Sequence, residues 1–252
     1  MADLDDPTTA MAPLPEAPAA PARPRRTWPA WIEILLCSGY PTQIALGSAL
    51  QGLGLRPLQE DGSLSAPFIF ALSLADTVLL LSLVIWLLVR RGESPLRVFF
   101  GTGPFGRELK LGALSLPLVF MLVIALTIAI RRFAPSLHNV PDNPLEGLLE
   151  APGGLWIFLV VVIVAGGVRE ELQRAFLLHR FRVDLGQPWM GVLITSLAFG
   201  MGHTLQGLDA AIITGALGAV WSVMYLTRNS AIAPMVSHSL FNSGELIRAV
   251  FR

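Results

Sequence analysis

Five polar side chains in or next to apolar stretches of the sequence have types that could hydrolyse a peptide bond. Glu170 and Glu171 follow one apolar run, His203 ends a second, and His238 and Asn242 lie in a third. A charged side chain deep in a bilayer costs about 2.5 to 3.5 kcal/mol on insertion scales. Each of these residues is therefore a candidate for function.

The chemistry open to these residue types is general acid–base hydrolysis. A carboxylate and an imidazole on neighbouring helices can share a water molecule and remove its proton. A second imidazole with a carboxamide one helical turn away can donate hydrogen bonds to a tetrahedral oxyanion. Residues four positions apart share one face of a helix, which pairs Glu170 with Arg174, Phe199 with His203, and His238 with Asn242. Three helices could thus direct polar groups at one point.

The length of the helix that carries Glu170 decides whether these groups can meet. At a rise of 1.5 Å per residue, a helix that stopped at Glu170 would leave this carboxylate at the membrane edge, far from His203. A helix that continues to about Arg182 brings Glu170, His203 and His238 within roughly 7 Å of mid-membrane. We therefore expect a continuous helix over residues 153–182.

Composition places these residues in a membrane protein. The chain has 252 residues, of which 53% are hydrophobic and 14% charged, and its mean hydropathy is +0.61. Soluble domains carry about 25% charged residues. The 18 cationic residues equal the 18 acidic ones, without a dominant basic block, so the surface needed for nucleic-acid binding is missing. A single cysteine, Cys37, excludes an intrachain disulfide.

Seven apolar runs of about the 20 residues that cross a bilayer follow one another. They are residues 30–50, 66–89, 111–130, 153–182, 189–204, 210–226 and 230–251. Because they lack the alternation of barrel strands, they must be helices. The predicted fold class is all-α, a multi-pass transmembrane helical bundle.

Domain boundaries and orientation follow from proline content and charge. Residues 1–29 are rich in proline and alanine and predict a disordered tail. Residues 30–252 predict the membrane domain, with the catalytic core at about 150–250.

The orientation in the membrane follows from a count of cationic residues on its two sides, from which Arg169 and Arg174 are left out. If the N-terminus lies in the cytoplasm, eleven cationic residues lie on the cytoplasmic side and five on the other side. The positive-inside rule therefore favours a cytoplasmic N-terminus. Seventeen arginines against one lysine indicate a GC-rich genome, and with it a bacterial plasma membrane.

Three motifs occur in a fixed order along the predicted core: EELQR from Glu170, FGMGH from Phe199 and HSLFN from His238. In this the sequence resembles the CPBP family, the CAAX protease and bacteriocin-processing group also called Abi, which includes the type II CAAX prenyl endopeptidases. The resemblance implies an intramembrane glutamate endopeptidase. It further implies that Glu170 and His203 activate the hydrolytic water and that His238 and Asn242 form the oxyanion site.

The resemblance gives the remaining motif residues a supporting part. Glu171 and Arg174 would hold the geometry of the site, and Phe199 would pack against it. One departure concerns the first motif, because the family usually has three residues between the second glutamate and the arginine, whereas EELQR has two. Alignment on the arginine would place Arg169 and Glu170 in the two acidic positions, which leaves open which glutamate is the base.

Cofactor, partners and alternative functions complete the expectations. The resemblance implies no metal, and the alternative is a zinc site made of Glu170, His203 and His238. The expected partners are membrane lipid and a membrane-associated peptide or protein substrate, of CAAX type or a leader peptide, with no nucleic acid. The alternative function is a non-catalytic membrane protein, either an immunity or assembly factor or a small transporter that would also use Asp76.

Overall fold

The computed structural model describes residues 27–251, and within this range every regular element is helical. The α-helices are α1 (Thr27–Leu36), α2 (Tyr40–Gly52), α3 (Ala66–Arg90), α4 (Pro95–Phe100), α5 (Phe105–Phe133), α6 (Gly154–Val161), α7 (Glu170–Val183), α8 (Pro188–Met201), α9 (Leu208–Arg228) and α10 (Ile232–Val250). The predicted all-α class is confirmed. Residues 1–26 of the predicted tail lie outside the described residues, and α1 begins at Thr27, within the segment predicted as the tail.

Three helices of the described chain are long and apolar enough to cross a membrane by themselves: α3, α5 and α9. Helix α8 is apolar but shorter. With the charged α7 and α10 packed among them, these helices form a multi-pass helical membrane protein. The predicted spans 66–89, 111–130 and 210–226 each fall within one of the three long helices.

The first predicted span, residues 30–50, is wrong as a single helix. The chain instead forms α1 and α2 with a sharp turn between them. Gly39 adopts φ 91°, in the left-handed region that glycine tolerates, and Pro41 lies in the first turn of α2. Because proline has no backbone N–H to continue a helix and is well accommodated in a first turn, the break falls just before it.

The predicted helix over residues 153–182 is confirmed and contains a feature that periodicity did not predict. Helix α6 continues without a break through a π-helical segment, η3 (Val162–Arg169), into α7. Here η3 lies directly against α10, since a Cβ added at Gly167 would lie 1.9 Å from the Ser239 hydroxyl oxygen. The glycines of η3 thus permit a close helix crossing immediately before Glu170.

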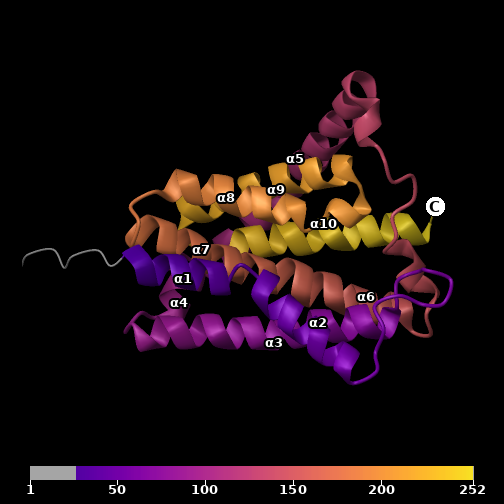
Figure 1. The fold of residues 1–252 in the computed structure, drawn as a ribbon. Helices are drawn as coiled ribbons and strands as arrows, with labels where there is room; N and C mark the ends of the chain where they lie inside the picture. Colours follow the sequence, from indigo (N-terminus) through magenta and orange to yellow (C-terminus); the bar gives the residue numbers. More distant parts are fainter. Residues whose placement is uncertain (1–26, 252) are drawn as a thin grey trace, which may run out of the picture.

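The helices lie largely side by side (Figure 1), with α7 to α10 stacked together, α3 along the opposite edge, and α5 rising away from this stack. Helix α5 packs against α10 and α9 on one side. Its other side exposes large apolar side chains, among them Leu114, Leu118, Met121, Ile124 and Ile128. In a membrane this face of α5 contacts lipid, because hydrocarbon is the environment that suits it.

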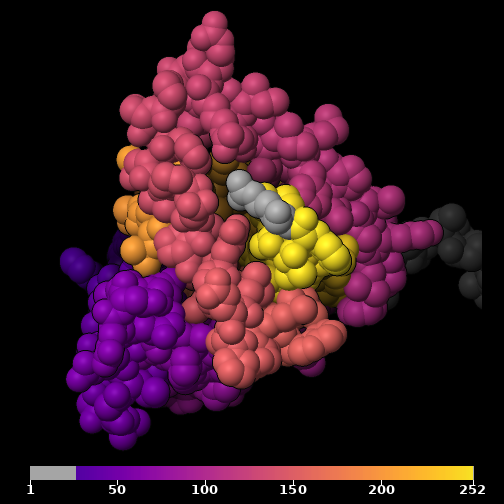
Figure 2. All heavy atoms as spheres, turned by 90° about the vertical axis from the view of Figure 1, so that its right-hand side faces the viewer, coloured from indigo at the N-terminus to yellow at the C-terminus, as the bar shows by residue number. Residues whose placement is uncertain are grey.

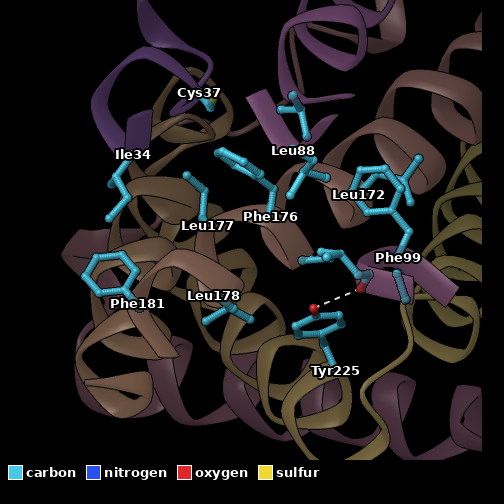
Figure 3. Packing of buried hydrophobic residues seen from close by; sticks show 14 of the residues in the cluster. Ile34, Cys37, Leu88, Phe99, Leu172, Phe176, Leu177, Leu178, Phe181 and Tyr225 are labelled. Carbon is cyan, nitrogen blue, oxygen red and sulfur yellow. Dashed lines mark hydrogen bonds between the residues drawn. The ribbon is translucent and has the colours of Figure 1, made fainter. Parts of the chain in front are cut away.

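Helix α7 lies in the centre of the largest apolar cluster (Figure 3). Its side chains Phe176, Leu178 and Phe181 are buried among residues from α1, α3, α4, α8 and α9. The hydroxyl of Tyr225 on α9 donates a hydrogen bond of 3.0 Å to the carbonyl of Val98 on α4. These contacts fix α7 within the bundle, and with it the position of Glu170 at its first residue.

The two ends of the bundle differ in the connections that they carry. At one end, the connection between α3 and α4 meets the end of α7, where Arg91 and Arg180 pair with Asp184 and Glu93. Figure 2 looks onto the other end, where the connection between α5 and α6 lies between the α2–α3 connection and the end of α10. The cytoplasmic assignment of the first end stays a prediction.

Candidate active site

Three consecutive side chains at the junction of η3 and α7 contact three different parts of the molecule. Arg169 contacts Asp76 on α3, Glu170 borders a cavity, and Glu171 contacts His238 on α10. Arg169 is the last residue of the π-helical segment and the two glutamates are the first residues of α7, so the wider turn of η3 ends at these three residues.

The Glu171 carboxylate is buried and links α7 to α10. It accepts hydrogen bonds from Arg174 and, at 2.8 Å, from Nδ1 of His238. Since an ionised carboxylate only accepts, Nδ1 carries the proton in this contact. The other ring nitrogen, Nε2, then lies 3.9 Å from Oε2 of Glu170. Glu171 therefore sets both the tautomer and the direction of the His238 ring.

Arg174 and Phe199 lie between these groups and α9. The guanidinium carbon of Arg174 is 4.6 Å from the centre of the Phe199 ring and 5.8 Å from that of Trp221. Trp221 also stacks on the His238 ring, with 3.8 Å between the centroids. The positive charge of Arg174 is thus compensated by Glu171 and by aromatic faces. These contacts order the ring of His238.

His203 lies beyond the end of a helix, although the predicted fifth span included it. Helix α8 ends at Met201, and Gly202 and His203 form the turn that follows. The Nδ1 atom of His203 lies 2.8 Å from the carbonyl oxygen of Phe199. A carbonyl only accepts, so Nδ1 carries the proton and Nε2 is left as an acceptor. In this tautomer His203 can act as a base through Nε2.

Asn242 lies on α10 against η3. Its Nδ2 atom donates to the carbonyl of Val162 at 3.4 Å. Gly166 provides the room for this approach, because a Cβ there would lie 2.7 Å from Nδ2. Asn242 and His238 are therefore next to the junction that carries Glu170.

A cavity of about 360 Å³ runs along α7. Sites for small ligands have volumes of about 300 to 1,000 Å³. Its polar lining includes Glu170, Arg174 and His203, and its apolar lining comes from α1, α6, α7, α8 and the connection before α6. Among the described residues, neither His238 nor Asn242 lines this cavity. The structure thus brings Glu170 and His203 to one cavity and leaves the α10 pair next to it.

Glu170 has a different environment from its neighbour. Its side chain is 23% exposed, against 1% for Glu171. Within residues 27–251, its carboxylate has two longer contacts, Oε1 to Arg169 at 3.8 Å and Oε2 to His238 at 3.9 Å. A carboxylate that borders a cavity without short hydrogen bonds keeps its lone pairs available for a water molecule or a substrate.

Polar residues to which the motif analysis gave no role complete the cavity wall. Gln43 lies on α2 and Gln173 on α7, and Tyr40 donates a hydrogen bond of 2.7 Å to the carbonyl of Ala198. No periodicity in the sequence pointed to these residues. Asp76 did give a signal, because it is an isolated charge within an apolar span.

The zinc alternative requires three ligands at one point. In the part of the chain from Thr27 to Phe251, no group of three histidine, cysteine, aspartate or glutamate side chains gathers closely enough to hold a metal ion. The Nδ1 atoms of His203 and His238 are both engaged, with the Phe199 carbonyl and with Glu171. Glu170, His203 and His238 therefore do not form a ligand set in this structure.

The chain was compared with curated proteins, solved structures and protein-family models. No curated protein and no solved structure matches the chain. A family model described as type II CAAX prenyl endopeptidase Rce1-like matches residues 151–244. The matched segment begins just before α6 and ends within α10, so it contains all three motifs and the contacts between α7 and α10. Residues 151–244 of this membrane protein thus match the Rce1-like family, and the resemblance inferred from the three motifs is confirmed.

Proposed function

We propose that this protein is an intramembrane endopeptidase in which Glu170 and His203 activate the hydrolytic water. The observation that carries the proposal is that these two residues, one at the start of α7 and one in the turn after α8, border the same cavity within the segment matched by the family. The available lone pairs of Glu170 and of His203 Nε2 give this cavity two groups that can accept a hydrogen bond from one water molecule.

The proposed reaction begins when the Glu170 carboxylate takes a proton from a water held by His203. The water oxygen attacks the carbonyl carbon of the peptide bond, and the carbonyl oxygen becomes an oxyanion. Collapse of this intermediate breaks the C–N bond, and the proton held by Glu170 passes to the leaving amine. The products are a carboxylic acid and an amine, so all atoms of the water are accounted for.

Asn242 and His238 are the proposed donors to the oxyanion. The amide of Asn242 has two hydrogens, and its long contact with Val162 engages one of them at most. His238 presents Nε2 towards Glu170, because Glu171 engages Nδ1. Donation from Nε2 requires the ring to carry a proton on both nitrogens.

The proposed substrate is a peptide or protein associated with the membrane. The name of the matched family suggests a CAAX-type C-terminus, and a leader peptide is the other class that the motifs suggested. The apolar lining of the cavity, which includes Leu177 and Phe158 on either side of Glu170 in sequence, suits apolar side chains of such a substrate. No metal or other cofactor takes part in the proposed reaction, and the proposed location is the plasma membrane of a bacterium.

The test is cleavage of a quenched-fluorescence peptide library by the protein purified in detergent. Loss of an acid–base group costs about 10² to 10⁴-fold in rate, so Glu170→Gln and His203→Ala should each lose at least about 10²-fold in kcat. Glu150→Gln, at an exposed position, and His138→Ala, at the contact with Asp209, are matched controls that should keep wild-type activity. Full activity of Glu170→Gln would contradict the proposal.

The non-catalytic alternative makes a different prediction for the same variants. A purely structural network would lose stability when Glu170 is replaced, and no peptide would be cleaved by the wild type. Because Glu170 borders the cavity without a short contact, we expect Glu170→Gln to keep the melting temperature of the wild type. A solute-transport assay on Asp76→Asn in vesicles addresses the transporter alternative.

A further inference from the structure

We infer that Asp76 is a positioning residue that holds the guanidinium of Arg169 away from the Glu170 carboxylate. This inference rests on the proposed role of Glu170. Asp76 lies on α3, outside the segment matched by the family. Through Arg169, a residue in the first half of the chain would thus influence the reacting carboxylate of Glu170 in the second half.

Asp76 is fully buried in the middle of α3 and carries a compensated charge. Its exposure is 0%, and its Oδ2 accepts hydrogen bonds from Arg169 and, at 3.4 Å, from Gln43. A buried carboxylate of this kind is costly unless it is paired. The ion pair with Arg169 offsets the free-energy cost of burying the Asp76 carboxylate.

Arg169 lies between the carboxylates of Asp76 and Glu170 and forms a direct ion pair only with that of Asp76. Its Nη2 atom contacts Asp76 directly, whereas its Nη1 atom is 3.8 Å from Oε1 of Glu170. Nη1 donates instead to the side-chain oxygen of Gln173 at 3.2 Å. Gln173 is itself held by the carbonyl of Cys37, to which it donates at 2.8 Å. The guanidinium is therefore fixed just outside hydrogen-bonding distance of Glu170.

Removal of the Asp76 charge would change this balance. A buried guanidinium that has lost its counter-ion is stabilised by pairing with another carboxylate. The nearest one in the described chain is that of Glu170. A shortening of the Nη1–Oε1 distance to about 2.8 Å would give a charge-assisted hydrogen bond. The lone pairs of Glu170 would then be engaged by Arg169, and the carboxylate would be a poorer acceptor for the proton of water.

A second, smaller cavity gives the guanidinium room for such a shift. It has a volume of about 140 Å³ and is lined in part by Gln43, Ser73, Arg169 and Glu170. Within residues 27–251, Oδ1 of Asp76 and Nε of Arg169 are buried without a hydrogen-bond partner. The pair is thus held by few contacts, and its geometry depends on the charge of Asp76.

Steady-state kinetics of three variants test the inference on a peptide that the wild type cleaves. For Asp76→Asn we expect kcat to fall by about 10²-fold with KM changed by less than about twofold, because the reacting group and not the binding surface is affected. Asp76→Glu, which keeps the charge, should retain most of the activity. Asp76→Asn combined with Arg169→Gln should be more active than Asp76→Asn alone, because the competing guanidinium is gone.

A chemical readout makes the test independent of catalysis. An apolar carbodiimide modifies accessible carboxyl groups, and mass spectrometry measures the modified fraction at Glu170. Modification of Glu170 should fall in Asp76→Asn and recover in the double variant, whereas the exposed Asp61→Asn should match the wild type. If Asp76→Asn does not fold, Asp76→Glu and the double variant still give the comparison.

Two sets of results would overturn the inference. The first is unchanged kcat and unchanged Glu170 modification in Asp76→Asn. The second is a double variant that is no better than Asp76→Asn in either measurement, as a merely structural pair would give. An inactive wild type with the expected modification pattern would contradict the proposed function and leave the positioning by Asp76 supported.

Discussion

Glu170 and Glu171 are adjacent residues of the same type, yet their carboxylates meet different partners. Glu171 is buried and bonded to Arg174 and His238, whereas Glu170 borders the cavity with contacts no shorter than 3.8 Å. A carboxylate held by a cation and an imidazole is suited to ordering its neighbours. A carboxylate without short contacts is suited to exchanging a proton.

The difference predicts unequal losses of stability for two matched variants. Glu171→Gln leaves Arg174 as a buried cation with a neutral partner, so we expect the free energy of unfolding to fall by about 3 to 5 kcal/mol. Glu170→Gln removes no short contact and should change the free energy of unfolding by less than about 1 kcal/mol. Chemical denaturation in detergent measures both values. Equal losses in the two variants would show that the carboxylates are equivalent.

At the scale of elements, an ionic cluster ties α7 to the connection between α3 and α4. Glu93 accepts from Arg180 at 2.6 Å and contacts His179 at 3.2 Å. Arg180, with 0% exposure, also lies 2.7 Å from Glu33 on α1. This cluster fixes the end of α7 opposite to the candidate site. The register of α7, and with it the depth of Glu170, therefore depends on the cluster.

Glu93 gives the cluster a defined pH dependence. Burial raises the pKa of Glu93, but hydrogen bonds from His179 and Arg180 and the charge of Arg180 outweigh it and hold the pKa below its ordinary value. A depressed pKa stabilises the fold above the unfolded-state pKa, and this stabilisation is lost as the pH falls through the folded-state pKa. Melting temperatures at descending pH should therefore drop more for the wild type than for Glu93→Gln.

The matched control for this prediction is Glu60→Gln. Glu60 is exposed in the connection between α2 and α3, so its removal should leave the pH dependence of the wild type unchanged. An acid-induced loss of stability that is the same in Glu93→Gln and the wild type would mean that Glu93 does not contribute to it.

The crossing of η3 with α10 is a second feature at this scale. It depends on Gly166 and Gly167, where added Cβ atoms would meet Asn242 and Ser239 at 2.7 and 1.9 Å. A larger residue at Gly167 would also meet the Cα of Ser239 at 3.0 Å and force α10 outwards, whereas one at Gly166 would displace the Asn242 side chain. The two glycines thus place the HSLFN motif beside the EELQR motif.

At the scale of the whole molecule, the two ends of the bundle should face opposite sides of the membrane. The cationic end holds the α3–α4 and α7–α8 connections, and the other end holds the α2–α3 and α5–α6 connections. With a cytoplasmic N-terminus, a cysteine at Glu60 should react with a membrane-impermeant thiol reagent added to intact cells. A cysteine at Gln187, which is also exposed, should react only after the cells are broken.

The native thiol does not interfere with this measurement, because Cys37 is buried and its substitution by serine provides a clean background. The reverse labelling pattern would place the N-terminus outside. Labelling of both positions in intact cells would contradict the assignment of the two connections to opposite sides.

Local patterns in the sequence determined the class of the protein and the identity of its motifs. Hydropathy over about 20 residues predicts membrane helices, because the thickness of the bilayer fixes their length. The four-residue spacing within HSLFN placed His238 and Asn242 on one helix face, whereas the same spacing in FGMGH did not predict that His203 lies in the turn after α8. The continuity of residues 153–182 followed from the depth that Glu170 needs. None of these inferences requires knowledge of which helices are neighbours.

Only the tertiary structure decided which glutamate borders the cavity and which supports His238. Adjacent residues on an α-helix point about 100° apart, and the preceding π-helical turn changes the starting angle. The partners of Arg169, Glu170 and Glu171 come from α3, the cavity and α10, which are far apart in the sequence. Because packing of distant segments sets these surroundings, motif spacing alone left the assignment of the two carboxylates open.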